Sequence, residues 1–129
     1  MPTRHGAALA ATALAVVVAA AACHTDTRTA APRIVRGASP SLGKQLIVKY
    51  GCGSCHEIPG VRGAEGLVGP PLIHFGRRGT IAGELSNTPD NLTRWVHDPH
   101  SVEPGTDMPN LGVTTAEARN IAAYLESLQ

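Results

Sequence analysis

The sequence predicts an all-α fold in which three helices are joined by wide loops rich in glycine and proline. Three stretches carry apolar residues at helical spacing, and each begins at a Ser or Thr that can cap a helix. No stretch reads as a convincing strand. The 129 residues include one Trp, two Tyr and one Phe, so a small domain would have few large side chains for its core. A bulky apolar cofactor would be a natural centre for that core.

The first helix is expected to start near Ser39 or Ser41. Pro40 then lies in the first turn, where its missing N–H is tolerated. The apolar positions at helical spacing are Leu42, Leu46, Ile47 and Tyr50. A Cys-x-x-Cys-His motif at residues 52–56 closes this helix.

The second and third helices have stronger boundary signals. Thr88 is the expected cap of the second helix, Pro89 its first residue and Pro99 its stop, and its apolar face is Leu92, Trp95 and Val96. Thr114 and Glu117 predict a capping box for the third helix, with a buried stripe of Ala118, Ile121, Ala122, Leu125 and Leu128. Residues 57–86 are dense in Gly and Pro, which predicts a long loop with a binding role.

The N-terminal part predicts export. Arg4 and His5 precede an apolar run of about 16 residues, shorter than the roughly 20 that a membrane-spanning helix needs. The run fits a secretory signal, predicted over residues 1–22. Residues 21–23 read Ala-Ala-Cys and resemble a bacterial lipobox, although Ala20 replaces the usual leucine, so Cys23 is a predicted lipid anchor. Simple cleavage and an uncleaved anchor are the alternatives, and all three export the domain.

Composition divides the rest of the chain into a flexible tether over residues 23–40 and one domain over residues 41–129. The tether is rich in Thr, Ala, Pro and Arg and lacks apolar periodicity. The near-neutral chain carries no Lys/Arg-rich tract, which argues against a nucleic-acid partner. From residue 41 onward, seven Lys or Arg stand against nine Asp or Glu, a net charge of −2. Steering by a basic face is therefore not expected, and a tether could instead supply a high effective concentration.

The motif Cys52-x-x-Cys55-His56 suits three chemistries. A redox dithiol should lie between a strand and a helix, and no strand is predicted. A structural zinc site needs four ligands, and the sequence has no second Cys-x-x-Cys pair. Covalent haem attachment needs this order of residues: two thiols add to the two vinyl groups, and the adjacent histidine binds the iron. The prediction is one covalent haem c.

Met108 is the predicted second iron ligand. It is the methionine that remains once the leader is removed, and it lies on a loop before Pro109. His97 and His100 are the competing ligands, and a bis-histidine site would have a lower potential than a His/Met pair. His74 is expected to be a loop histidine without iron contact.

Residues 41–129 resemble class I c-type cytochromes of bacteria. Gly43 resembles the glycine of their N-terminal helix, where the C-terminal helix crosses closely and brings an aromatic, here Tyr124. The segment Gly-Pro-Pro-Leu, with Pro70 and Leu72, resembles a segment whose proline carbonyl accepts the N–H of the iron-bound histidine. The match also includes the loop around Met108.

Two further roles come from the same resemblance. Phe-Gly-Arg at residues 75–77 resembles a segment whose arginine approaches a haem propionate, so Arg77 is the expected contact and Arg78 the substitute. Trp95 falls where the family has an aromatic over the haem.

The resemblance implies a one-electron carrier and not an enzyme, since both axial positions of the iron are filled and no small-molecule substrate binds. It implies a bacterial respiratory chain, with redox partners such as a terminal oxidase or a periplasmic enzyme. The predicted location is the periplasmic face of the inner membrane, with lipidated Cys23 as the membrane contact. The alternatives are a haem subunit fixed in an oxidase complex, and a five-coordinate haem enzyme or gas sensor.

Overall fold

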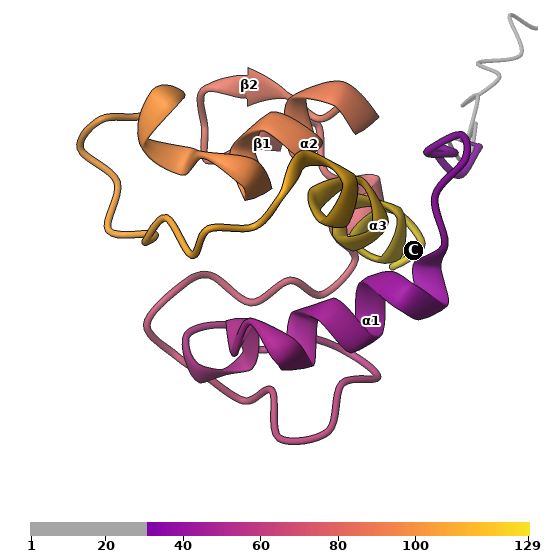
Figure 1. Cartoon of the computed structure of the whole chain (residues 1–129), viewed down its shortest axis with the longest axis horizontal. Helices are drawn as coiled ribbons and strands as arrows, with labels where there is room; N and C mark the ends of the chain where they lie inside the picture. The colour runs from indigo at the N-terminus through magenta and orange to yellow at the C-terminus, as the bar shows by residue number, and fades with distance from the viewer. Residues whose placement is uncertain (1–30) are drawn as a thin grey trace, which may run out of the picture.

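The computed structural model describes residues 31–129 (Figure 1). The predicted signal sequence, Cys23 and the tether up to residue 30 lie outside these residues and stay predictions. Among the described residues, none of the helices has both the length and the apolar composition that a membrane span needs.

Helix α1 spans Pro40–Lys49 and begins as predicted. The Ser39 hydroxyl accepts a hydrogen bond from the Leu42 N–H at 3.3 Å, and Pro40 occupies the first turn. The buried face is Gly43, Leu46 and Ile47. The chain then turns through Gly51, at a φ of 68° that suits glycine, into the 3-10 turn η1, Cys52–Ser54.

The long loop after the motif holds a 3-10 turn, η2 (Phe75–Arg77), and a small hairpin that the sequence did not predict. Strands β1 (Thr80–Ile81) and β2 (Leu85–Ser86) are antiparallel, with Ile81 opposite Leu85. The expectation of no strand is wrong here. Strands of two residues are too short to show an alternating pattern. The turn between them places Ala82 at a positive φ of 53°, which a residue other than glycine rarely adopts, so the sequence carries no signal for it.

Helix α2 spans Pro89–His97 and α3 spans Thr115–Glu126, with the short turn η3 (Pro99–Ser101) after α2. Thr88 caps α2 by accepting from the Asn91 N–H at 3.2 Å. Both bonds of the predicted capping box at Thr114 and Glu117 are present. The three predicted helices are confirmed.

Helix α3 packs against both α1 and α2 (Figure 1). A Cβ added at Gly43 would lie 1.9 Å from the Asn120 carbonyl oxygen, so glycine permits the close crossing of α1 and α3. The nearest atoms there are α3 backbone rather than an aromatic ring. Tyr124 instead donates its hydroxyl to the Pro59 carbonyl at 2.6 Å and so holds the loop after the motif.

The segment before α1 contacts the domain, which differs from the predicted flexible tether over residues 23–40. Val35 is buried, and the Ser39 N–H donates to the Asn120 side chain at 2.8 Å. Arg119 donates to the Arg36 carbonyl at 2.7 Å, and Arg33 reaches the η2 turn. Within residues 31–129, contacts with the helical domain are therefore already made by Arg33.

Candidate functional site

A cavity of about 380 Å³ lies between α1, the long loop, α2, α3 and the loop that precedes α3. Most of its lining is apolar, and the aliphatic and aromatic side chains include Ile47, Ile58, Leu72, Phe75, Ile81, Leu92, Val96, Ile121 and Leu125. A cavity of this kind, with a few polar groups at fixed places, suits a bulky apolar ligand.

The two cysteines of the motif form one wall of this cavity. Cys52 and Cys55 both line it, and both thiols are free. The η1 turn brings them together, since the Cys55 N–H donates to the Cys52 carbonyl at 3.2 Å. Burial raises the pKa of the Cys52 thiol. Two thiols facing one apolar space are placed for a shared ligand.

His56 follows on the same wall, and its ring is held by the backbone. Its Nδ1 lies 2.8 Å from the Pro70 carbonyl oxygen, the contact that the resemblance implied. This contact requires the Nδ1–H tautomer and leaves Nε2 with its lone pair. Gly69 makes room for the ring, because a Cβ there would lie 2.3 Å from His56 Cε1. Leu72 is buried and lines the cavity close by.

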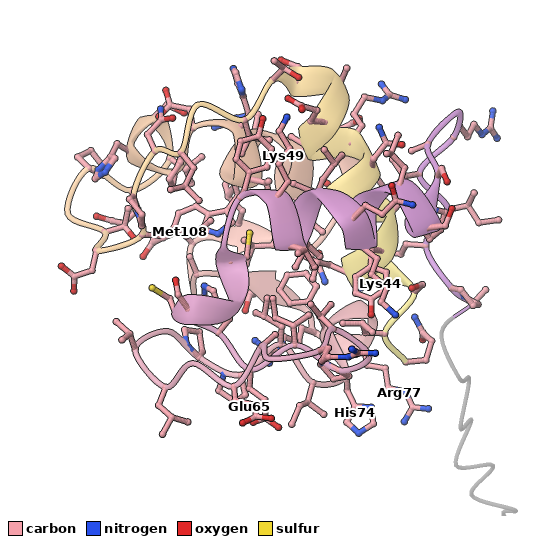
Figure 2. All side chains as sticks on the ribbon, turned by 60° about the horizontal axis from the view of Figure 1, so that its bottom comes forward. Lys44, Lys49, Glu65, His74, Arg77 and Met108 are labelled. Atoms are coloured by element: carbon pink, nitrogen blue, oxygen red, sulfur yellow. The ribbon has the colours of Figure 1, made fainter. Side chains whose placement is uncertain are left out.

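Met108 lines the cavity from a different segment, the loop between η3 and α3, together with Trp95 of α2. Its N–H donates to the Thr106 hydroxyl at 3.2 Å. In Figure 2 it lies on the side of the molecule opposite the segment that precedes α1. The structure thus brings an imidazole and a thioether to one apolar space.

The competing histidines lie outside the cavity lining. His97 places Nδ1 2.6 Å from the Val113 carbonyl, which joins the end of α2 to the start of α3. His74 places Nδ1 2.6 Å from the Gln129 carbonyl, and His100 is exposed. Their placement favours Met108 as the partner of His56.

Of the two neighbouring arginines, Arg78 lines the cavity and Arg77 does not. Arg77 is exposed and projects at the edge of the molecule beside His74 (Figure 2). Arg78 donates to the carbonyls of Pro71 and Ile73, and its guanidinium lies 5.3 Å from the centroid of the Phe75 ring. A 3-10 turn has three residues per turn, which places residues 75 and 78 on one side. The structure thus places Arg78, the expected substitute, at the cavity, and a propionate contact by either arginine stays a prediction.

Sequence reasoning missed two parts of the cavity lining, namely the β1–β2 hairpin and Val68 in the long loop. Thr80 and Ile81 of β1 line the cavity, as does Ala82 in the turn that follows. Val68 lines it too, yet is 82% exposed, next to Leu67 at 89%. Such exposed aliphatic residues in a Gly-rich loop give no periodic signal that could place them.

The residues present fit a haem c. The two thiols share one wall, the imidazole presents a free Nε2, a thioether lines the same space, and the rest of the lining is largely apolar. The imidazole of His56 packs so closely against Gly69 that a single Cβ added there would collide with the ring.

Comparison with known proteins agrees with this chemistry. A family model described as Cytochrome c matches residues 40–129. Cytochrome c oxidase subunit 2 of Alkalihalophilus pseudofirmus is 35% identical over 88 residues, which cover 67% of this chain and 25% of that protein. The subunit 2 of Bacillus sp. (strain PS3) is 34% identical over 89 residues, with 66% and 25% covered. That of Bacillus subtilis is 31% identical over 91 residues, with 67% and 26% covered. The chain spans about a quarter of the length of these relatives.

Proposed function

The chain belongs to the cytochrome c family, and on that premise we propose that it is a one-electron carrier with one covalently bound haem c. In this proposal Cys52 and Cys55 would attach the haem, and His56 and Met108 would bind its iron. One observation supports it above the others: all four side chains line the same apolar cavity. When bound, haem supplies an iron that alternates between ferric and ferrous states.

The backbone holds His56 ready as a ligand. The Pro70 carbonyl accepts the Nδ1–H, which fixes the tautomer and the ring orientation and makes Nε2 a stronger donor. Met108 offers a neutral, soft sulfur, which favours the reduced state and raises the potential relative to a second histidine. With both side chains engaged, no position is left for a substrate, so the proposed role is electron transfer without catalysis.

The walls of the cavity and its rim suit this role. The apolar lining keeps water out and favours the state of lower charge. Val68 lines the cavity and is exposed, as is its neighbour Leu67, and residues 41–129 carry a net charge of −2. Docking would then depend on apolar contact more than on long-range charge attraction.

The proposed setting is a bacterial respiratory chain, at the periplasmic face of the inner membrane, with lipidated Cys23 as anchor and a terminal oxidase or periplasmic enzyme as partner. The oxidase subunits among the relatives support an oxidase as partner. They equally favour a second candidate, a haem subunit fixed in an oxidase complex. The domain could serve either as a tethered shuttle or as such a subunit.

Two experiments test the proposal: the first tests covalent attachment of the haem, and the second distinguishes a shuttle from a fixed subunit. Covalent attachment is tested by acidified-acetone extraction of the purified full chain: haem should stay with the protein, and in Cys52→Ser/Cys55→Ser it should be extracted or absent. The setting is tested by purifying the host's oxidase through a tag on another subunit. A stoichiometric amount of this chain after extensive washing would indicate a fixed subunit, and its loss a shuttle. Extraction of all haem from the unaltered protein would contradict the attachment.

A further inference from the structure

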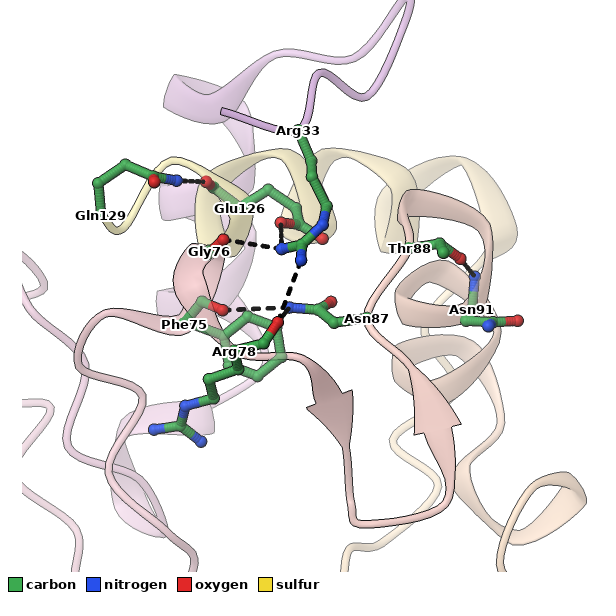
Figure 3. A network of polar contacts seen from close by, with 9 residues as sticks. All are labelled: Arg33, Phe75, Gly76, Arg78, Asn87, Thr88, Asn91, Glu126 and Gln129. Carbon is green, nitrogen blue, oxygen red and sulfur yellow. Dashed lines mark hydrogen bonds and ion pairs between the residues drawn. The ribbon is translucent and has the colours of Figure 1, made fainter. Parts of the chain in front are cut away.

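Arg33 connects three distant segments of the chain (Figure 3). It lies in the segment before α1, outside the residues 40–129 that match the family model. Its Nη1 donates to the Gly76 carbonyl at 2.7 Å and to Glu126 Oε2 at 3.3 Å. Its Nη2 donates to the Arg78 carbonyl at 3.2 Å. One planar guanidinium thus joins the pre-helix segment, the η2 turn and the end of α3.

Glu126 explains why an arginine is held at this place. The Glu126 side chain is fully buried, with 0% exposed, and its Oε1 has no hydrogen-bond partner. Burial raises the pKa of this carboxyl, and the Arg33 guanidinium opposes that rise. A buried carboxylate without a counter-charge is strongly destabilising. Arg33 is its ion-pair partner within the described residues.

Asn87 holds the η2 turn from the other side. Its Nδ2 donates to the Phe75 and Arg78 carbonyls, each at 3.1 Å (Figure 3). The Arg78 carbonyl therefore accepts hydrogen bonds from both Arg33 and Asn87. The η2 turn packs directly against the end of α3, because a Cβ added at Gly76 would lie 2.3 Å from the Glu126 carbonyl oxygen.

The η2 turn matters for the site because the side chains of Phe75 and Arg78 both line the cavity. We propose that Arg33 is a positioning residue: by fixing the backbone of residues 76–78 it holds this wall of the cavity in place and thereby sets the reduction potential. The effect on the potential depends on the proposed function, whereas the effect on the turn does not.

The direction of the effect follows from solvation. A released turn lets Phe75 and Arg78 move away from the cavity and water enter it. Polar surroundings favour the more highly charged ferric state over the ferrous state, so the potential falls. The same release exposes the amide hydrogen bonds of the turn, which include Gly76 N–H to the Leu128 carbonyl and Arg78 N–H to the Phe75 carbonyl.

The test compares Arg33→Lys with the matched control Arg36→Lys in the full-length holoprotein. Lysine keeps the positive charge beside Glu126 but lacks the planar fork that also reaches the Arg78 carbonyl. It is chosen over methionine because methionine would leave the buried carboxylate unpaired. Arg36 is an exposed residue in the same segment, and its carbonyl, not its side chain, makes the contact to Arg119. The readouts are the midpoint potential and amide hydrogen exchange at residues 76–78.

We expect Arg33→Lys to have a lower potential than the unaltered protein and exchange about fivefold faster at Gly76 or Arg78, the change that one lost hydrogen bond produces. Arg36→Lys should change neither. Unchanged exchange in Arg33→Lys would overturn the proposal, and faster exchange at an unchanged potential would overturn its link to the site. A parent protein without haem would refute the proposed function and the effect on potential, while exchange would still decide whether Arg33 fixes the turn.

Discussion

Gly69→Ala should dislodge His56 from its backbone contact. The new Cβ would lie 2.3 Å from Cε1 and 2.6 Å from Nδ1 of the ring. Carbon atoms in contact are about 3.5–4.0 Å apart, so the ring or the loop must move by more than about 1 Å. The Nδ1 contact to Pro70 is 2.8 Å now, and such a shift takes it out of hydrogen-bond range.

The magnitude combines two effects. Forcing a methyl group into a packed site costs about 1–3 kcal/mol, and a lost hydrogen bond costs about 0.5–1.5 kcal/mol. The expected loss of unfolding free energy is therefore about 1.5–4.5 kcal/mol. For a domain of this size, each kcal/mol lowers Tm by about 4–8 °C, so Tm should fall by at least about 6 °C.

The assay is thermal unfolding of the purified holoprotein, followed by circular dichroism in the haem band, together with its midpoint potential. Gly79→Ala is the matched control, since a Cβ there meets nothing within 4 Å. It should leave Tm and potential close to those of the unaltered protein. A Gly69→Ala protein that melts within about 2 °C of the control with an unchanged potential would refute the reasoning about the packing of Gly69 against His56.

Three further predictions follow from the same structure. Met108→Ala should keep the haem attached, lower its potential and admit carbon monoxide to the iron; an unchanged potential and spectrum would show that another residue is the ligand. Glu117 should contribute to the stability of the fold against acid. Its hydrogen bond to Lys49, followed by those to Thr114 and Tyr50, lowers its pKa to about 2. Because the pKa of this carboxyl in the folded protein lies below its ordinary value of 4.5, its stabilisation is present above that value and is lost as pH falls toward 2. Denaturant unfolding at several pH values should therefore show a shallower acid loss in Glu117→Gln, and equal slopes would contradict this. Electron transfer to the partner should depend weakly on salt; a steep loss of rate between low and physiological ionic strength would exclude an apolar docking surface.

The sequence could predict features that depend on near neighbours in the chain. Ser39, Thr88 and Thr114 cap the three helices through bonds to residues three positions on, and such local signals place helix starts reliably. The motif Cys52-x-x-Cys55-His56 is also local, and a loop methionine completes the predicted ligand set. The structure places these side chains around one cavity.

Features that depend on the phase of a short turn or on distant partners could not be predicted. The choice between Arg77 and Arg78 depends on a three-residue turn whose phase the sequence does not show. The hairpin depends on Ala82 in a left-handed conformation. Arg33 falls within the predicted tether because its three acceptors lie at least 43 residues away, and no local pattern links them.

The most direct test of the central claim is an optical spectrum of the purified full-length protein, oxidised and reduced, with and without carbon monoxide. The account predicts a low-spin c-type spectrum, with a weak far-red sulfur-to-iron band in the oxidised state, that carbon monoxide does not change. A high-spin spectrum that shifts with carbon monoxide would contradict it, because the iron would then have an open position and Met108 would not be its ligand.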